Sequence, residues 1–95
     1  MFLYVHISVP PEVVAQGPTE ANFGSNVYIK CAVLKGYPLP SVSIITPQGK
    51  VIKQSVISFN ATMEDAGNYT CIANNSVATA TGSLSLAVHS MFITT

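Results

Sequence analysis

The feature that most restricts the fold of this chain is the alternation of apolar and polar side chains in runs such as residues 27–33 and 84–88. A β-strand points successive side chains to opposite faces, so a period of two is typical of half-buried strands, whereas a helix repeats every three or four residues. No stretch of the chain is a good candidate for a helix. We therefore predict an all-β fold.

Turn-forming residues separate the apolar runs at intervals of about ten residues. Clusters rich in glycine, proline and asparagine occur at 10–11, 17–18, 23–26, 36–40, 47–49, 64–67 and 74–76. The predicted strands between them are 13–15, 27–33, 41–45, 51–52, 55–59, 67–74 and 79–88. Short strands with such frequent turns predict a two-sheet sandwich or a small barrel.

The length and the charge of the chain exclude several classes of protein. Its 95 residues are enough for one domain and too few for two. Four lysines, no arginine and four acidic residues give a net charge of zero, so we expect no binding of nucleic acid or anionic lipid. Only 8% of the residues are charged, against about 25% in average domains. Polar side chains and glycans must then maintain solubility, which favours an extracellular protein.

The N-terminal stretch 1–9 is the most apolar part of the chain, but His6 and Ser8 interrupt it. It is far shorter than the roughly 18 residues of a membrane span, and it lacks the basic start and small-residue cleavage site of a signal peptide. We interpret it as a flanking segment at the start of a fragment, and we expect no direct insertion of this chain into a membrane.

Both cysteines lie at core-facing positions of predicted strands. Cys31 shares a face with Val27 and Ile29, and Cys71 shares a face with Tyr69 and Ala73. A disulfide between them would close a long loop and stabilise the fold by about 4 kcal/mol. The alternative is a pair of buried thiols in a cytosolic domain.

The segment from Asp65 to Cys71 has the pattern D-x-G-x-Y-x-C, and with the earlier Cys31 it resembles the immunoglobulin superfamily. Residues 36–43 are similar to the G-x-P-x-P stretch of the intermediate and C2-type sets, which occur in cell-adhesion, receptor and matrix proteins. The resemblance covers residues 10–88 and implies a Greek-key sandwich of about seven strands. It also implies a Cys31–Cys71 disulfide and a tyrosine corner formed by Asp65, Gly67 and Tyr69.

The chain departs from the family pattern at its centre. It has no tryptophan to pack on the disulfide, and Ile44 stands at that position. The segment between Ile44 and Val56 is short for the family, which predicts a short or missing middle strand. The arginine that usually pairs with the aspartate is also missing, so Asp65 must find Lys50, Lys53 or backbone donors.

A further departure concerns the strand before the aspartate. Ile57 and Phe59 alternate one residue out of step with the usual core positions of the family, so we expect a bulge or a shifted register there.

The sequence offers no catalytic constellation. Its few carboxylates are not paired with a nucleophile or base, and its two histidines lie near opposite ends of the chain. We predict that the protein is not an enzyme, and that it has no metal site and no cofactor.

Three N-glycosylation sequons begin at Asn60, Asn68 and Asn74. Because Asn68 alternates with Tyr69 and Cys71, its side chain is expected to face solvent. Three sequons within so short a stretch of a charge-poor chain favour a glycoprotein. The alternative is ordinary surface asparagines that stabilise turns.

The same alternation places Ile45, Thr70 and Ile72 outward on neighbouring strands, as a candidate interface. Neighbouring domains, glycans or a different register could instead cover them.

Our interpretation is an extracellular immunoglobulin-like module for protein recognition or adhesion at residues 10–89, within a larger secreted or membrane-anchored protein. Residues 1–9 and 90–95 would be flanking segments. The expected partner is a protein, either another copy or a different molecule, or an adjacent domain. The alternatives are a structural spacer in a tandem array and an intracellular muscle-type domain with reduced cysteines.

Overall fold

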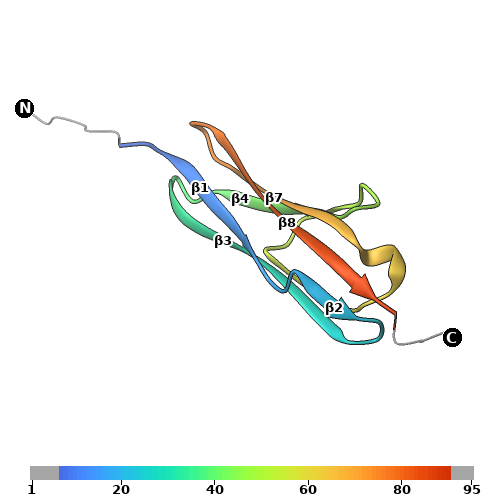
Figure 1. Cartoon of the computed structure of the whole chain (residues 1–95). Helices are drawn as coiled ribbons and strands as arrows, with labels where there is room; N and C mark the ends of the chain where they lie inside the picture. Colours follow the sequence, from blue (N-terminus) through green and yellow to red (C-terminus); the bar gives the residue numbers. More distant parts are fainter. Residues whose placement is uncertain (1–6, 91–95) are drawn as a thin grey trace, which may run out of the picture.

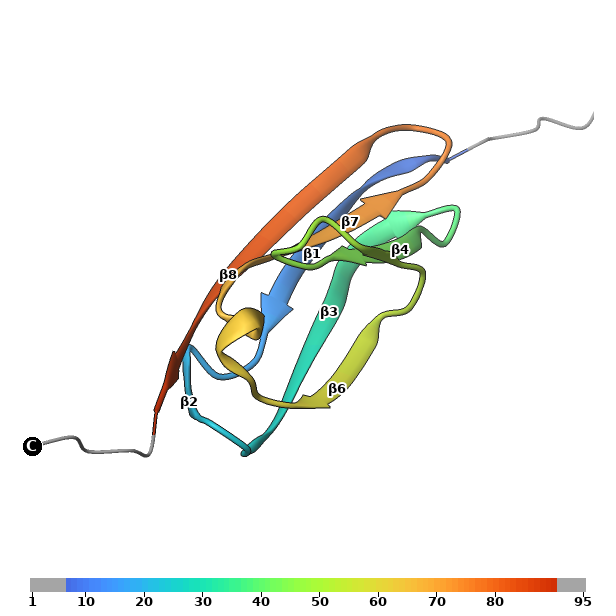
Figure 2. The same cartoon turned by 90° about the vertical axis from the view of Figure 1, so that its right-hand side faces the viewer.

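The computed structural model describes residues 7–90, which form two β-sheets packed face to face (Figures 1 and 2). The strands are β1 (Val9–Gln16), β2 (Glu20–Asn22), β3 (Asn26–Tyr37), β4 (Ser41–Ile45), β5 (Val51–Ile52), β6 (Val56–Asn60), β7 (Gly67–Asn74) and β8 (Thr79–His89), with one 3₁₀ turn, η1 (Met63–Asp65). The prediction of an all-β sandwich is confirmed.

One sheet has the order β1-β3-β6, and the other has the order β2-β8-β7-β4-β5. All pairs are antiparallel except β2 and β8, which are parallel. Most strands that follow one another along the chain, such as β3 and β4, lie in different sheets; β4–β5 and β7–β8 are neighbours in the same sheet. This connectivity crosses the sandwich repeatedly and brings distant segments together in one core.

The prediction for the first strand was wrong, because β1 starts at Val9 and not at residue 13. We interpreted Pro10 and Pro11 as a turn. An edge strand tolerates proline where the ladder is irregular, because the missing N–H is not needed there. The pairing of β1 with β3 shifts register on both sides of Glu12, so the prolines lie in such an irregular stretch.

The middle of the chain follows the sequence more closely. β5 has only two residues, Val51 and Ile52, as the short segment predicts. The expected bulge or shifted register at Ile57 and Phe59 was wrong, because β6 pairs with β3 in a continuous register with Ile57 opposite Ile29. Ile57 and Phe59 both pack against the core from the inner face. β2 was not predicted, because a strand of three residues is too short to display alternation.

A disulfide between Cys31 and Cys71 joins the two sheets at the centre of the core, with an S–S distance of 1.97 Å. The side chains of Cys31 and Cys71 are 3% and 1% exposed. Ile44 is fully buried and lies opposite Cys71 in the β4–β7 ladder, so it packs beside the disulfide. The remaining buried apolar residues are Val13, Val27, Ile29, Ala61, Tyr69, Ala73, Leu86 and Val88.

Residues 1–6 and 91–95 lie outside the described part of the chain. Most of the expected flanking segments, including His6, therefore fall there. Within residues 7–90, no helix has the length and apolar character needed to cross a membrane.

Replacing both cysteines, as Cys31→Ala with Cys71→Ala, should lower the free energy of unfolding by about 4 kcal/mol, because the closed loop restricts the unfolded chain. A typical domain has about 5–15 kcal/mol in total, so the variant should be close to unfolding at physiological temperature. Urea denaturation measures the difference. The reduced wild-type chain serves as the control and should match the variant; an unchanged unfolding midpoint in both would contradict the role of the disulfide.

Candidate functional site

The loop between β6 and β7 is held by one tyrosine and one aspartate. The hydroxyl of Tyr69 donates a hydrogen bond to the backbone carbonyl of Asp65 at 2.6 Å. The Asp65 carboxylate accepts hydrogen bonds from the backbone N–H of Thr62 at 2.8 Å and from its hydroxyl at 2.9 Å. We expected Lys50, Lys53 or backbone donors for Asp65. In the structure the donors are the backbone N–H and the hydroxyl of Thr62, and neither lysine takes part.

Burial, and to a smaller extent the nearby negative charge of Asp65, together raise the pKa of Tyr69 from its ordinary value of 10.0 to about 12. Both effects disfavour the phenolate. The phenol therefore stays protonated and can donate its hydrogen bond over the whole neutral range.

Gly67 opens β7 directly after this loop. Its φ of +136° lies in a region that other residues rarely adopt, and a Cβ added there would lie 2.8 Å from Cβ of Pro47. The glycine of the D-x-G-x-Y pattern is therefore needed for two reasons: its backbone conformation is strained for other residues, and Pro47 leaves no room for a side chain.

The expected interface residues lie together on the outer face of the five-stranded sheet. Ile45 is opposite Thr70 in the β4–β7 ladder and opposite Val51 in the β4–β5 ladder, and Ile72 is one outward position further along β7. Ile45, Thr70 and Ile72 are half-buried, and Val51 is 55% exposed. We call Ile45, Val51, Thr70 and Ile72 the outer-face patch.

Two of the three sequons flank this patch. Asn68, Thr70, Ile72 and Asn74 occupy alternate positions of β7, so all four side chains belong to the same outer face. Asn60 lies at the end of β6 in the other sheet. All three asparagines are exposed, so the fold leaves each of them accessible to a glycan.

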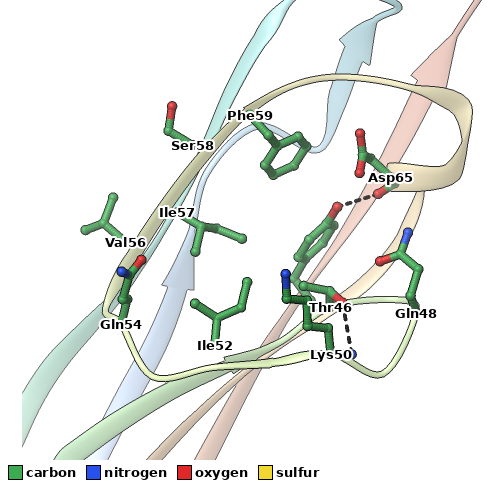
Figure 3. Close-up of a pocket in the computed structure, with 11 residues that line it drawn as sticks. Thr46, Gln48, Lys50, Ile52, Gln54, Val56, Ile57, Ser58, Phe59 and Asp65 are labelled. Carbon is green, nitrogen blue, oxygen red and sulfur yellow. Dashed lines mark hydrogen bonds between the residues drawn. The ribbon is translucent and has the colours of Figure 1, made fainter.

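A pocket of about 610 Å³ opens between β5 and β6, at the edge of the sandwich. Figure 3 shows Ile57 and Phe59 of β6 pointing into it toward Ile52, whereas Val56 and Ser58 point away. The ring of Phe59 stacks on Tyr69, with ring centroids 5.9 Å apart. Sequence reasoning missed this pocket, although the short β4–β6 segment was a signal that this edge would stay open.

Asn75 ties together three segments at the end of the sandwich where β1 begins. Its amide nitrogen donates to the carbonyls of Val9 and Pro38, at 2.8 and 3.1 Å. Its amide oxygen accepts hydrogen bonds from the backbone N–H groups of Val77 and Ala78. Figures 1 and 2 both show the start of β1 beside the β3–β4 and β7–β8 turns. Apart from the turn-forming residues at 74–76, no local pattern indicates this role.

The same end is rich in exposed apolar side chains. Tyr37 and Leu39 flank Pro38, and they are 62% and 86% exposed. Ile7 lies two residues before Val9, and Val77 lies two residues after Asn75. Both side chains are also exposed. We call Ile7, Tyr37, Leu39 and Val77 the end patch.

Across residues 7–90, no group of three or more histidine, cysteine, aspartate or glutamate side chains could hold a metal ion. Lys35 forms an ion pair with Glu12, and His89 lies within hydrogen-bonding distance of Glu20; all four side chains are exposed on the surface.

Residues 10–75 match the model of the family described as immunoglobulin domain. ADAMTS-like protein 3 from Homo sapiens is 36% identical over 72 residues, which are 68% of this chain and 4% of that protein. The leucine-rich repeat and fibronectin type III domain-containing protein 1-like protein from Danio rerio is 32% identical over 90 residues, 83% of this chain and 13% of that protein. The chain thus spans a small part of these relatives.

The fold also matches solved structures. The structure of the amphioxus IgVJ-C2 molecule aligns with a TM-score of 0.79 at 26% identity, over 85% of this chain and 46% of that chain.

Tyr69→Phe should lower the free energy of unfolding by about 1 kcal/mol at neutral pH, because it removes the hydrogen bond to Asp65. The folded-state pKa of Tyr69 lies above the unfolded value, so this contribution is complete below pH 10 and is lost as the pH rises toward 12. The stability difference between wild type and variant should therefore shrink in alkaline solution. Urea denaturation between pH 7 and 12 measures it.

The matched control is Tyr28→Phe, which removes an exposed hydroxyl from β3. It should leave the stability nearly unchanged at every pH. A Tyr69→Phe difference that stays constant through pH 12 would refute the assigned cause of the pKa shift.

Proposed function

This chain belongs to the immunoglobulin domain family, and on that basis we propose that it is an extracellular recognition module of a larger multidomain protein. It binds a protein partner through one sheet face and carries out no chemistry. We place the domain at residues 10–89, with residues 1–9 and 90–95 as its connections to the rest of the protein.

The outer-face patch is the observation that carries this proposal. Ile45 and Val51 are neighbours across one ladder, and Thr70 and Ile72 continue the patch onto β7. A partly apolar patch on a flat sheet is suited to a protein partner, because it offers area to bury without a cavity for a small molecule. The ladders hold these four side chains on a rigid surface, which lowers the entropy lost on binding.

An extracellular location is supported by the covalent chemistry of the chain. Disulfides persist in oxidising compartments, and Cys31–Cys71 is the bond that joins the sheets. The exposure of Asn60, Asn68 and Asn74 permits glycans that would offset the low surface charge.

The end patch favours a second candidate function, that of a spacer in a tandem array. It lies where the chain enters β1, so a domain preceding this one would be tethered beside Leu39 and Tyr37. Such contacts would fix the angle between two domains without any external ligand.

The recognition proposal is tested with the domain secreted from glycosylating cells, coupled to beads and presented to cell surfaces and to other coated beads. The double variant Ile45→Asp, Ile72→Asp should abolish binding, because it places two charges in the outer-face patch. Tyr28→Asp is the matched control, since it adds a charge to the outward side of the other sheet. Equal binding by all three proteins, or no binding by any, would reject recognition through this face.

The glycosylation proposal is tested by intact mass measurement before and after enzymatic removal of N-linked glycans. The wild-type chain should lose mass, and each of Asn60→Gln, Asn68→Gln and Asn74→Gln should remove one glycan. These substitutions keep an exposed amide, so folding should be unaffected. A secreted chain whose mass does not change on treatment would contradict the proposal.

A further inference from the structure

β6 is an edge strand with unused hydrogen-bonding groups. It is the last strand of the sheet β1-β3-β6, and Figure 2 shows it beyond β3 at the margin of the molecule. The Ser55 carbonyl and both backbone groups of Ala61 bond to the β3 side. Since the direction alternates along a strand, the N–H and C=O groups of residues 56, 58 and 60 point away from β3.

No residue of β6 removes a backbone hydrogen-bonding group from this edge. The strand reads Val-Ile-Ser-Phe-Asn, without proline or a charged residue, which are the usual means of protecting an edge. Within residues 7–90, no backbone hydrogen bond occupies the outward groups of Val56, Ser58 and Asn60. The free N–H and C=O groups of this edge can therefore form hydrogen bonds with a further strand.

The pocket lies along this edge. Atoms of Val56 and Ser58 help to line it, and its interior holds the apolar side chains of Ile52, Ile57 and Phe59 (Figure 3). A strand added beside β6 would direct alternate side chains to the same side as Ile57 and Phe59. Those side chains would enter the pocket, so its occupant should carry apolar residues at every second position.

The charges around β6 specify which strand fits best. Lys53 precedes β6 and Glu64 follows it, whereas Lys50 and Asp65 both line the pocket. Neither Lys53 nor Glu64 forms an ion pair in the described part of the chain. An antiparallel copy of the same segment would reverse this order and bring opposite charges together.

We propose that β6 pairs antiparallel with β6 of a second copy of this chain, around a two-fold axis at Ser58. Val56 then lies opposite Asn60 of the second copy, and Ile57 lies beside its Phe59 on the pocket side. Lys53 of each copy approaches Glu64 of the other. The contact is isologous, so it closes as a dimer and leaves no further β6 edge free.

The size of the contact sets its strength. Two phenylalanines bury about 150–250 Å² each at most, and the ladder spans only five residues. The total is below the roughly 1,200 Å² of stable complexes, so the dimer is weak and depends on concentration. This inference does not rest on the recognition proposal, since the outer-face patch belongs to the other sheet.

The test is sedimentation velocity on the whole chain, made in an oxidising bacterial periplasm without N-linked glycans, from micromolar to millimolar concentration. The wild type should form dimers at the higher concentrations. Ser58→Pro should abolish them, because the N–H that it removes points away from β3 and serves only the dimer. Ser58→Ala is the matched control and should still dimerise.

A charge exchange tests the same contact without proline. Lys53→Glu and Glu64→Lys should each weaken dimerisation roughly fivefold, and the double variant should restore it, because the opposite charges face each other again. A wild type that stays monomeric throughout, a Ser58→Pro protein that still dimerises, or an unrestored double variant would overturn the proposal. The Ile45→Asp, Ile72→Asp protein should dimerise through β6 like the wild type, which separates this test from that of the recognition surface.

Discussion

The disulfide between Cys31 and Cys71 is the constraint on which the rest of the structure depends. It joins β3 of one sheet to β7 of the other, and its two sulfur atoms lie in the centre of the core. A sulfur bridge fixes the distance between the sheets, so the space around it must be filled by side chains of matching size. Ile44 fills one side of that space, beside Cys71. Tyr69 packs two residues away on the same face of β7, and its hydroxyl holds the preceding β6–β7 loop through Asp65.

The same constraint decides where a partner could bind. Once Tyr69, Cys71 and Ala73 face inward, Asn68, Thr70, Ile72 and Asn74 must face outward, because β7 alternates. One strand therefore supplies the core, two sequons and half of the outer-face patch. Glycans on the two flanking asparagines would border the patch and restrict the approach of a large partner.

The shortness of the middle segment has a consequence at the other margin of the sandwich. The two-residue strand β5 cannot cover the space between the sheets, and within residues 7–90 β6 is the last strand of its sheet. The pocket between β5 and β6 and the unpaired backbone of β6 both result from this missing cover. A short segment between β4 and β6 can thus leave the edge of β6 free to pair with another strand, whereas a longer segment could cover that edge.

The sequence by itself determined the strands whose side chains alternate, the inner and outer faces of β7, and the burial of both cysteines. These properties follow from local periodicity, so they can be inferred without knowledge of the rest of the chain. Only the tertiary structure decided that β1 continues through Pro10 and Pro11, that Thr62 is the partner of Asp65, and that Asn75 joins three segments. It also decided that the edge of β6 stays open. Each of these depends on segments that are distant along the chain or on precise loop geometry, and no local pattern encodes which of them will meet.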